Sequence, residues 1–265
     1  MHAYVAGVSV WGPGLPGWAA SRAILAGEQP WQETPLATPV PAILSPTERR
    51  RTGPMVRLAL AAAAEASTMA GFAPGGVRSV FGTGNGDSTV VHAILSELCG
   101  AEPMVSPTQF HNSVHNAAAG YWSIGTSSVE PASCVGGHDA TFAATLMMAM
   151  AEIAAEQVPL LLCVYDLPMP AALNLKRPIA MPFGVALALR PAHAPGSLAC
   201  LDARYTASPA DPATTTPRQP WLQALTHGNP AARALRLMEA LACHRADQGA
   251  LAYLDGRLDV ALTPC

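Results

Sequence analysis

The sequence predicts an α/β protein in which helices flank a mixed, mainly parallel sheet. Candidate strands alternate with candidate helices over residues 3–190, the order that is typical of this class. Leu160–Tyr165 is a continuous apolar run, as expected for a strand buried on both faces. Ala140–Ala155 is apolar nearly all round, so we expect both faces of this helix to be buried.

Apolar runs bounded by turn residues define the other elements. The expected strands are Ala3–Val10, Val77–Phe81, Ser127–Cys134, Gly184–Leu189 and Ser197–Tyr205, with Leu251–Leu262 as a last hairpin or edge strand. The expected helices are Trp18–Leu25, Met55–Ala70, Ser88–Leu98, one from about residue 116 to residue 124, and Trp221–Ala246 with a break near Gly228. Six prolines between residues 27 and 54 predict a surface loop. Because prolines become frequent after Arg190, we divide the chain into an N-terminal unit (1–190) and a short C-terminal extension (191–265) packing on it.

Composition excludes several classes of protein. The chain has 265 residues, of which 50% are hydrophobic and 12% charged, so a disordered or solvating role is excluded. The net charge is −3 and the cations cluster only at Arg49–Arg51, which argues against nucleic-acid binding. The apolar windows are far shorter than the ~18–20 residues that span a bilayer. Six scattered cysteines without CxxC spacing, and no signal-peptide pattern, favour a cytoplasmic protein with reduced thiols.

A glycine cluster, Gly82–Gly86, follows one of the expected strands. Glycines after a strand can let a phosphate approach the N-terminus of a helix. The spacing here is GxGxG, and it lacks the third glycine of the dinucleotide-binding pattern. A tight strand-to-helix turn is therefore the favoured interpretation, and we expect no cofactor.

Two histidines, His111 and His115, are four residues apart, and Asn112 and Asn116 repeat at the same interval. On a helix this spacing would place both imidazoles on one face, as in some metal sites. No third ligand follows at a recognisable spacing, so we expect no metal. The favoured interpretation is that these polar side chains pin a loop by hydrogen bonds or line a cavity.

Cys134 lies shortly before His138 and Asp139, between an expected strand and the apolar helix. A cysteine at such a junction can gain thiolate character from a helix N-terminus and act as a nucleophile. A free cysteine can equally be a small buried apolar residue. The local sequence leaves both interpretations open.

Several stretches occur in the order of one known family. The segment YVAGVSVWGPGLPGWAASRAILAGEQPW contains the phrase Leu-Ala-Gly (Leu25–Gly27) after its expected helix. The helix 56–71, the turn Gly82–Gly84, and a stretch from Ser106 through Asn116-x-x-Ala119-Gly120-x-x-Ser123-Ile124 follow. Together they resemble the N-terminal half of a β-ketoacyl synthase of the thiolase fold, over residues 2 to about 190. The chain is most similar to the short synthase-like proteins that accompany a full synthase in aryl-polyene and related pigment clusters. The resemblance therefore implies a truncated thiolase-like fold.

Departures from the family bear on mechanism. Counting from Asn116 without a gap places Pro131 on the family's Gly-Pro-Ser turn and Asp139 at the position of the nucleophilic cysteine. A two-sided gap would bring Cys134 onto that position but would lose the match at Pro131, so we favour the ungapped register, in which Asp139 caps the helix. The family's His-Gly-Thr-Gly-Thr and Gly-His phrases are absent from the sequence. We therefore expect no condensing activity of the chain alone.

The resemblance implies a non-catalytic, chain-length-factor-like subunit that supports acyl or polyene chain elongation by a partner synthase. The implied partners are a full-length β-ketoacyl synthase in a heterodimer and an acyl carrier protein, with a homodimer when the chain is alone. The family dimerises through the strand before the nucleophile, here near Ser128–Cys134. His138 and Phe142 join the cavity or loop-pinning candidates, and Arg49–Arg51 is a candidate landing site for the carrier protein.

Two other functions stay open at the level of sequence. One is an acyltransferase or acyl-thioester hydrolase that uses Cys134, with His138 or His111 as the base. The other is an acyl-carrier or lipid-binding module without a synthase partner.

Overall fold

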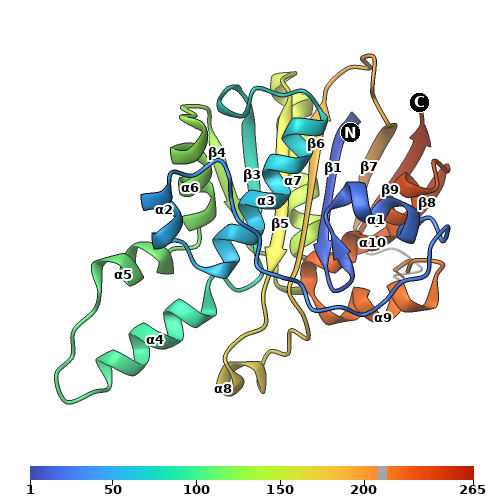
Figure 1. Cartoon of the computed structure of the whole chain (residues 1–265). Coiled ribbons are helices and arrows are strands. Elements are labelled where there is room, and N and C mark those ends of the chain that lie inside the picture. Colours follow the sequence, from blue (N-terminus) through green and yellow to red (C-terminus); the bar gives the residue numbers. More distant parts are fainter. Residues whose placement is uncertain (208–213) are drawn as a thin grey trace.

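One sheet organises the molecule (Figure 1), of which this computed structural model describes residues 1–207 and 214–265. The strands are β1 (His2–Gly12), β2 (Leu15–Pro16), β3 (Arg78–Gly82), β4 (Ala132–Val135), β5 (Leu160–Asp166), β6 (Phe183–Arg190), β7 (Ala199–Ala207), β8 (Asp247–Tyr253) and β9 (Gly256–Pro264). Their order in the sheet is β4-β3-β5-β6-β1-β7-β9-β8, with β2 paired to β1. The sheet thus runs unbroken from the N-terminal unit into the C-terminal extension.

The sheet is mixed, as predicted, but its parallel part is small. β3 pairs in parallel with β4 and β5, whereas the other pairs are antiparallel. This corrects the expectation of a mainly parallel sheet. Parallel neighbours need long crossover connections, and these occur only around β3, β4 and β5. The chain instead returns from β5 to β6 without a full helical crossover, and β8 and β9 form the expected hairpin.

Helices cover both faces of the sheet's centre. They are α1 (Trp18–Leu25), α2 (Pro46–Arg51), α3 (Pro54–Met69), α4 (Ser88–Leu98), α5 (Pro107–Ser113), α6 (Ala117–Thr126), α7 (Thr141–Glu156), α8 (Ala171–Asn174), α9 (Pro220–Gly228) and α10 (Leu235–Ala242), with 3-10 turns η1 (Pro74–Gly76), η2 (His138–Ala140) and η3 (Pro230–Ala234). On one face α3 and α6 pack on the sheet; on the other, α7, η3, α9, α10 and α1 do. Alternate residues of β5 enter the two cores, Leu162 one and Leu161 the other. The continuous apolar run predicted this burial on both faces.

Two short helices lie where the sequence predicts loop. In α2, Pro46 occupies the first turn and the Ser45 hydroxyl accepts a hydrogen bond from the backbone N–H of Glu48 (3.3 Å), a common helix start. α5 also has a proline, Pro107, in its first turn, but its N-cap residue Ser106 makes no capping side-chain hydrogen bond among the described residues, and the helix ends before α6. β4 is shorter than expected because Ser127 adopts a left-handed conformation, with φ of 55°, and Pro131 lacks an N–H.

α7 is less buried than its composition predicts. Thr141–Leu146 are all buried, and the helix packs on β3, β5 and η3. Beyond this stretch one face stays buried, including Met150 and Ile153, whereas Met147 is half-buried and Ala151 is exposed. The expectation that both faces are buried is therefore correct only for Thr141–Leu146.

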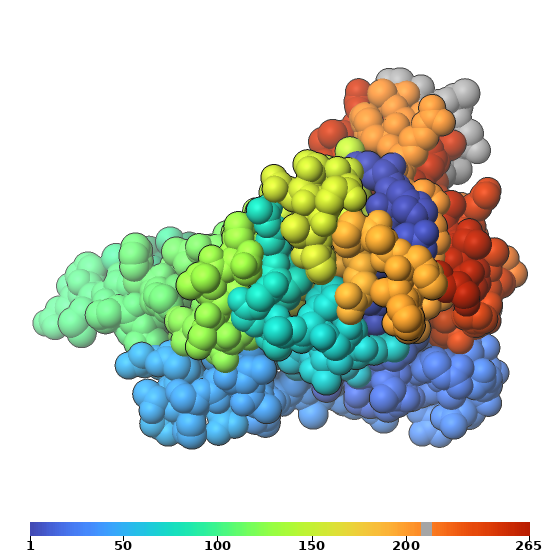
Figure 2. Space-filling view, turned by 90° about the horizontal axis from the view of Figure 1, so that it is seen from above, coloured from blue at the N-terminus to red at the C-terminus, as the bar shows by residue number. Residues whose placement is uncertain are grey.

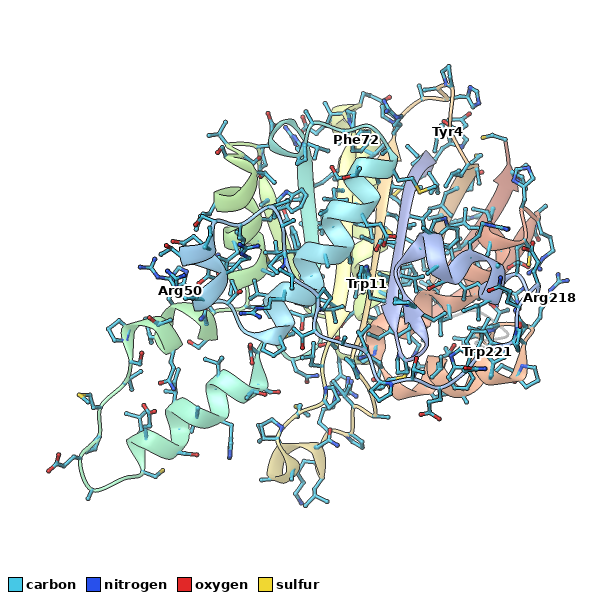
Figure 3. All side chains as sticks on the ribbon, viewed as in Figure 1. Tyr4, Trp11, Arg50, Phe72, Arg218 and Trp221 are labelled. Atoms are coloured by element: carbon cyan, nitrogen blue, oxygen red, sulfur yellow. The ribbon has the colours of Figure 1, made fainter. Side chains whose placement is uncertain are left out.

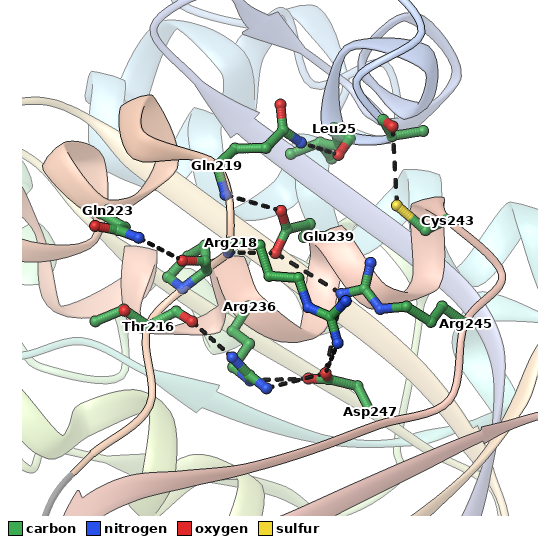
Figure 4. A network of polar contacts seen from close by, with 12 residues as sticks. Leu25, Thr216, Arg218, Gln219, Gln223, Arg236, Glu239, Cys243, Arg245 and Asp247 are labelled. Atoms are coloured by element: carbon green, nitrogen blue, oxygen red, sulfur yellow. Dashed lines mark hydrogen bonds and ion pairs between the residues drawn. The ribbon is translucent and has the colours of Figure 1, made fainter.

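A polar network fixes the C-terminal extension (Figure 4). The Glu239 carboxylate is 2% exposed and accepts hydrogen bonds from the backbone N–H groups of Arg218 (2.8 Å) and Gln219 (3.1 Å). Arg236 forms an ion pair with Asp247 (2.8 Å). It also donates a hydrogen bond to the backbone carbonyl of Thr216, in the segment 214–219 that contains Arg218 and Gln219. The extension is thus held by charged groups as well as by strand pairing. In the described part of the chain, no helix is long and apolar enough to cross a membrane.

Candidate functional site

The candidate site is the strand–turn–helix junction between β4 and α7. Gly136 and Gly137 leave the strand, and η2 then carries His138 and Asp139 to the start of α7. His138 adopts φ of 53°, in the left-handed region that residues other than glycine seldom occupy. Such strained backbone persists where surrounding contacts enforce it, and it concentrates at functional sites.

Asp139 forms an ion pair at this junction. Its Oδ1 accepts a hydrogen bond from Arg177 Nη1 at 2.7 Å. Partial burial alone would raise the pKa of Asp139, but the hydrogen bond and the charge of Arg177 outweigh it and lower that pKa below its usual value. Asp139 therefore carries a charge at neutral pH.

The expectation that Asp139 caps α7 is wrong. The N-cap of α7 is Ala140, and no described side chain caps it. The intervening turn η2 moves Asp139 out of the capping position, and its carboxylate faces Arg177 instead.

Cys134 lies inside β4, level with Phe81 of β3. It is half-buried beside the core between the sheet and α3. Burial raises the pKa of its thiol, which disfavours the reactive thiolate. Among the described residues, none forms a hydrogen bond to Cys134 Sγ, and the His138 side chain is 69% exposed with its Nδ1 3.6 Å from Asp139. His138, one of the two candidate bases, thus faces Asp139.

The structure separates His111 from His115. α5 ends at Ser113, so the two imidazoles do not share a helix face and the predicted spacing forms no metal site. The His111 ring meets Tyr121 edge-on at 5.6 Å. Asn112 is buried, and its Nδ2 donates a hydrogen bond to the backbone carbonyl of Arg51 at 2.8 Å. That bond joins α5 to the end of α2.

The other three candidates differ in their surroundings. His115 Nε2 lies 3.0 Å from the backbone carbonyl of Thr83, in the glycine turn. Asn116 precedes α6 as its N-cap residue, yet its side chain caps no backbone group in the described part of the chain. Phe142 is 1% exposed near the start of α7, and it lines a small cavity of about 30 Å³ together with Thr215 and Arg233. Of these, only His115 contacts the turn Gly82–Gly86 that follows β3.

Sequence reasoning missed a buried carboxylate, Asp166, which ends β5. Its Oδ1 accepts hydrogen bonds from Thr83 Oγ1 (2.8 Å) and from the Gly84 N–H (3.0 Å). Burial raises the pKa of Asp166 to about 6, against the lowering effect of these hydrogen bonds. Asn229 donates hydrogen bonds to the backbone carbonyls of Asp166 and Met181. The signal in the sequence was a single charge directly after a buried strand.

Two hollows meet at Asp139. One, of about 580 Å³, runs from the junction along the open side of α7, with Met147 and Met148 on its wall and Leu254 opposite. The other, of about 300 Å³, lies towards Arg233 and the segment 214–216. Two grooves with mostly apolar walls therefore open beside the same carboxylate.

An apolar arm projects from the sheet's β4 end (Figures 1 and 2). It comprises α4, α5 and the loop between them, residues 88–113. Its exposed apolar side chains are Leu95 (52%), Leu98 (48%), Met104 (79%) and Phe110 (65%), with Val114 (43%) just beyond it. At the same end, Val129 next to β4 is 95% exposed. Large apolar groups concentrated in one region are typical of a contact surface.

Comparison with known proteins identifies the fold class, a thiolase-like ketosynthase fold. One chain of a structure titled as the ketosynthase ApeO in complex with its chain length factor ApeC, from Xenorhabdus doucetiae, is 18% identical, with a TM-score of 0.71 and coverage of 98% of this chain and 99% of that one. The ishigamide ketosynthase/chain length factor is 16% identical, with a TM-score of 0.69 and coverage of 99% of each chain. A β-ketoacyl synthase from Burkholderia phymatum STM815 is 12% identical, with a TM-score of 0.70 and coverage of 100% of this chain and 99% of that one.

The sequence itself fixes the family. The family model described as the N-terminal domain of β-ketoacyl synthase matches residues 22–245, and the chain belongs to this family. The resemblance predicted from its motifs is thus confirmed. A search among curated protein sequences finds no match.

Proposed function

We propose that this chain is a non-catalytic, chain-length-factor-like subunit that supports acyl or polyene chain elongation by a partner β-ketoacyl synthase. The observation that carries the proposal is the Asp139–Arg177 ion pair at the junction where we place the synthase nucleophile. Condensation needs a thiol that accepts the acyl group as a thioester. A carboxylate held by a guanidinium cannot supply that thiol, so chemistry is left to the partner.

The contacts of Cys134 argue against the alternative of a thiol enzyme. Burial raises its pKa, and no base among the described residues lies within hydrogen-bond distance. A lipid-binding role finds its support in the hollow along α7, whose wall includes Met147 and Met148. In the proposed complex we assign that hollow to part of the growing acyl chain, so an unpartnered lipid-binding module stays the second candidate.

The partner is a full-length β-ketoacyl synthase, bound at the β4 end. In the described part of the sheet β4 pairs with β3 alone, so its other edge is free to join a strand of another chain. The apolar arm lies at the same end and offers side chains such as Met104 and Phe110 to that chain. A structure titled as a ketosynthase in complex with its chain length factor shares this fold. When alone, the chain forms a homodimer through the same surface.

An acyl carrier protein is the second proposed partner. Arg49, Arg50 and Arg51 end α2, and Arg50 reaches away from the sheet in Figure 3. Arg51 is paired with Glu48 (3.0 Å), so Arg49 and Arg50 carry most of the attraction for an acidic protein. One structural neighbour is titled as an acyl-carrier protein in complex with its ketosynthase. The six free cysteines support a reducing, cytoplasmic location for this assembly.

Reconstitution tests the proposal. The chain is co-expressed with a candidate β-ketoacyl synthase and an acyl carrier protein, the heterodimer is isolated, and acyl adducts are mapped by peptide mass spectrometry. We expect elongation by the heterodimer, none by the chain alone, and an adduct only on the synthase. Cys134→Ser should retain full elongation, with Cys243→Ser as the matched control. An acyl adduct on Cys134, or loss of elongation in an intact Cys134→Ser heterodimer, would establish the thiol enzyme instead.

A further inference from the structure

Three potential metal ligands meet far from the candidate site, on the pair of strands β1 and β7. The antiparallel register places His2 directly opposite Asp202, and Tyr4 opposite Cys200. Side chains two residues apart on a strand, and those of directly paired residues, share one face of a sheet. His2, Cys200 and Asp202 therefore lie on one face, although about 200 residues separate the first from the other two.

Their distances suit a single metal ion. His2 Nδ1 lies 3.0 Å from Asp202 Oδ1, and Cys200 Sγ lies 3.3 Å from His2 Nδ1 and 3.6 Å from Asp202 Oδ2. Zinc binds nitrogen, oxygen and sulfur ligands at about 2.0–2.3 Å in a tetrahedron. Ligand atoms at those lengths stand roughly 3.3–3.8 Å apart, from tetrahedral geometry. Small side-chain rotations thus convert the observed contacts into a coordination shell.

We propose that His2, Cys200 and Asp202 bind one Zn²⁺ ion, with water in the fourth position. A thiolate, an imidazole and a carboxylate form a borderline-soft ligand set that selects zinc over calcium or magnesium. On binding, the Cys200 thiol transfers its proton to solvent, so that one thiolate and one carboxylate balance the dication. The His2 and Asp202 side chains are 47% and 56% exposed, which leaves a path for the ion.

Neighbouring aromatic rings hold His2 in place. Its ring meets Tyr4 edge-on at 4.9 Å, and Tyr4 in turn meets His193 at 5.5 Å. Figure 3 shows Tyr4 near the N-terminal end of β1. Groups that orient the ligands around a metal restrict their rotamers and raise affinity. The cluster is therefore supported from outside as well as by strand pairing.

The site would join the first strand to the C-terminal extension. An ion that binds only the folded chain stabilises it according to its concentration and affinity. This proposal departs from the prediction of no metal, because the sequence pattern could not bring residue 2 next to residue 200. It is independent of the proposed synthase partner.

Cobalt titration tests the site. The full chain, without a histidine tag and freed of metal by a chelator, is titrated with Co²⁺ and then Zn²⁺. We expect one equivalent of Co²⁺ to give a thiolate-to-cobalt charge-transfer band, and Zn²⁺ to displace it. Cys200→Ser should abolish the band. His2→Gln and Asp202→Asn should weaken binding by at least about tenfold, since even residues that only orient ligands change affinity by that much.

Two control variants distinguish this site from adventitious binding. Cys265→Ser removes the thiol that interacts electrostatically with Cys200, and His193→Gln removes the nearby imidazole; both should keep the band and the stoichiometry. Circular dichroism of each variant confirms folding before titration. Absence of the band in the wild-type chain, or its persistence in Cys200→Ser, would overturn the proposal. So would loss of the band in Cys265→Ser.

Discussion

The two ends of the sheet differ in whether the described chain covers their outer edge. At the β8 end, Thr215 bonds with both the backbone N–H and carbonyl of Ala250, and the buried Glu239 holds the adjoining segment. At the β4 end, the described chain provides no second neighbour for a four-residue strand and leaves an apolar arm exposed. Proteins normally shield a free edge. The contrast indicates that the chain completes one end by itself and leaves the other for a second chain.

The largest expected effect on stability is at the β8 end of the sheet, which the chain covers itself. Glu239→Ala removes a carboxylate that is 2% exposed and leaves the N–H groups of Arg218 and Gln219 without an acceptor. Hydrogen bonds to a charged group contribute about 1.5–3 kcal/mol each, so losing two should cost about 3–6 kcal/mol. Urea unfolding followed by circular dichroism should show a loss of that size. The control, Glu28→Ala, removes an exposed pair with Arg22 and should cost less than about 1 kcal/mol; equal losses would contradict the contrast.

Asp166 lies on β5, between the two ends of the sheet, and tests whether burying a carboxylate there lowers the free energy of unfolding. Its pKa is about 6 in the folded chain and 3.8 as a free side chain, so the folded state binds more protons between these values. Stability from this group therefore falls as pH rises from about 4 to about 6, by about 3 kcal/mol at ~1.4 kcal/mol per pH unit.

Asp166→Asn should remove that pH dependence. The amide oxygen can still accept from Thr83 Oγ1 and the Gly84 N–H, so the variant should gain stability relative to wild type as pH rises and then level off above about pH 6. Thermal unfolding across this range measures the difference. Asp139→Asn is the control of opposite sign, because the pKa of Asp139 is lowered. A constant difference between Asp166→Asn and wild type would refute the assignment.

A substitution at the β4 end should weaken partner binding and leave the free energy of unfolding nearly unchanged. Phe110→Ser alters a side chain that is 65% exposed, so the free energy of unfolding should change by less than about 0.5 kcal/mol. Capture by a co-expressed synthase should weaken by tenfold or more, since exposed aromatic residues commonly dominate interfaces. Leu175→Ser, 85% exposed beside α8, is the matched control. Equal capture by both variants would remove the arm from the proposed interface.

The sequence predicted local elements well and distant contacts poorly. Trp18–Leu25 and Ser88–Leu98 form helices with the expected bounds, because caps and breakers act within a few residues. The start of α2 also had a local signal, Ser45 followed by Pro46 and Glu48, that the high proline content obscured. Strand direction depends on connections across the whole fold, and this is why the parallel content was overestimated.

Site contacts were harder to predict than elements. The family's motif spacing singled out Asp139 as a candidate, but its partner Arg177 lies 38 residues away in a loop without a motif. The Asn112 hydrogen bond to Arg51 spans 61 residues in the same way. Such pairs depend on tertiary packing, which local pattern does not encode.

The smallest expected effect concerns Asp139 itself. Its ion pair with Arg177 is partly exposed, at 55% for the Asp139 side chain and 19% for Arg177, and solvent screens such pairs. Asp139→Ala should therefore change the free energy of unfolding by less than about 1 kcal/mol, measured by urea titration at neutral pH. If this residue has no catalytic part, the variant heterodimer should also elongate acyl chains at the wild-type rate. A large loss of elongation with unchanged stability and partner capture would show that the carboxylate takes part in chemistry, and the β4 end would then be an active site as well as an interface.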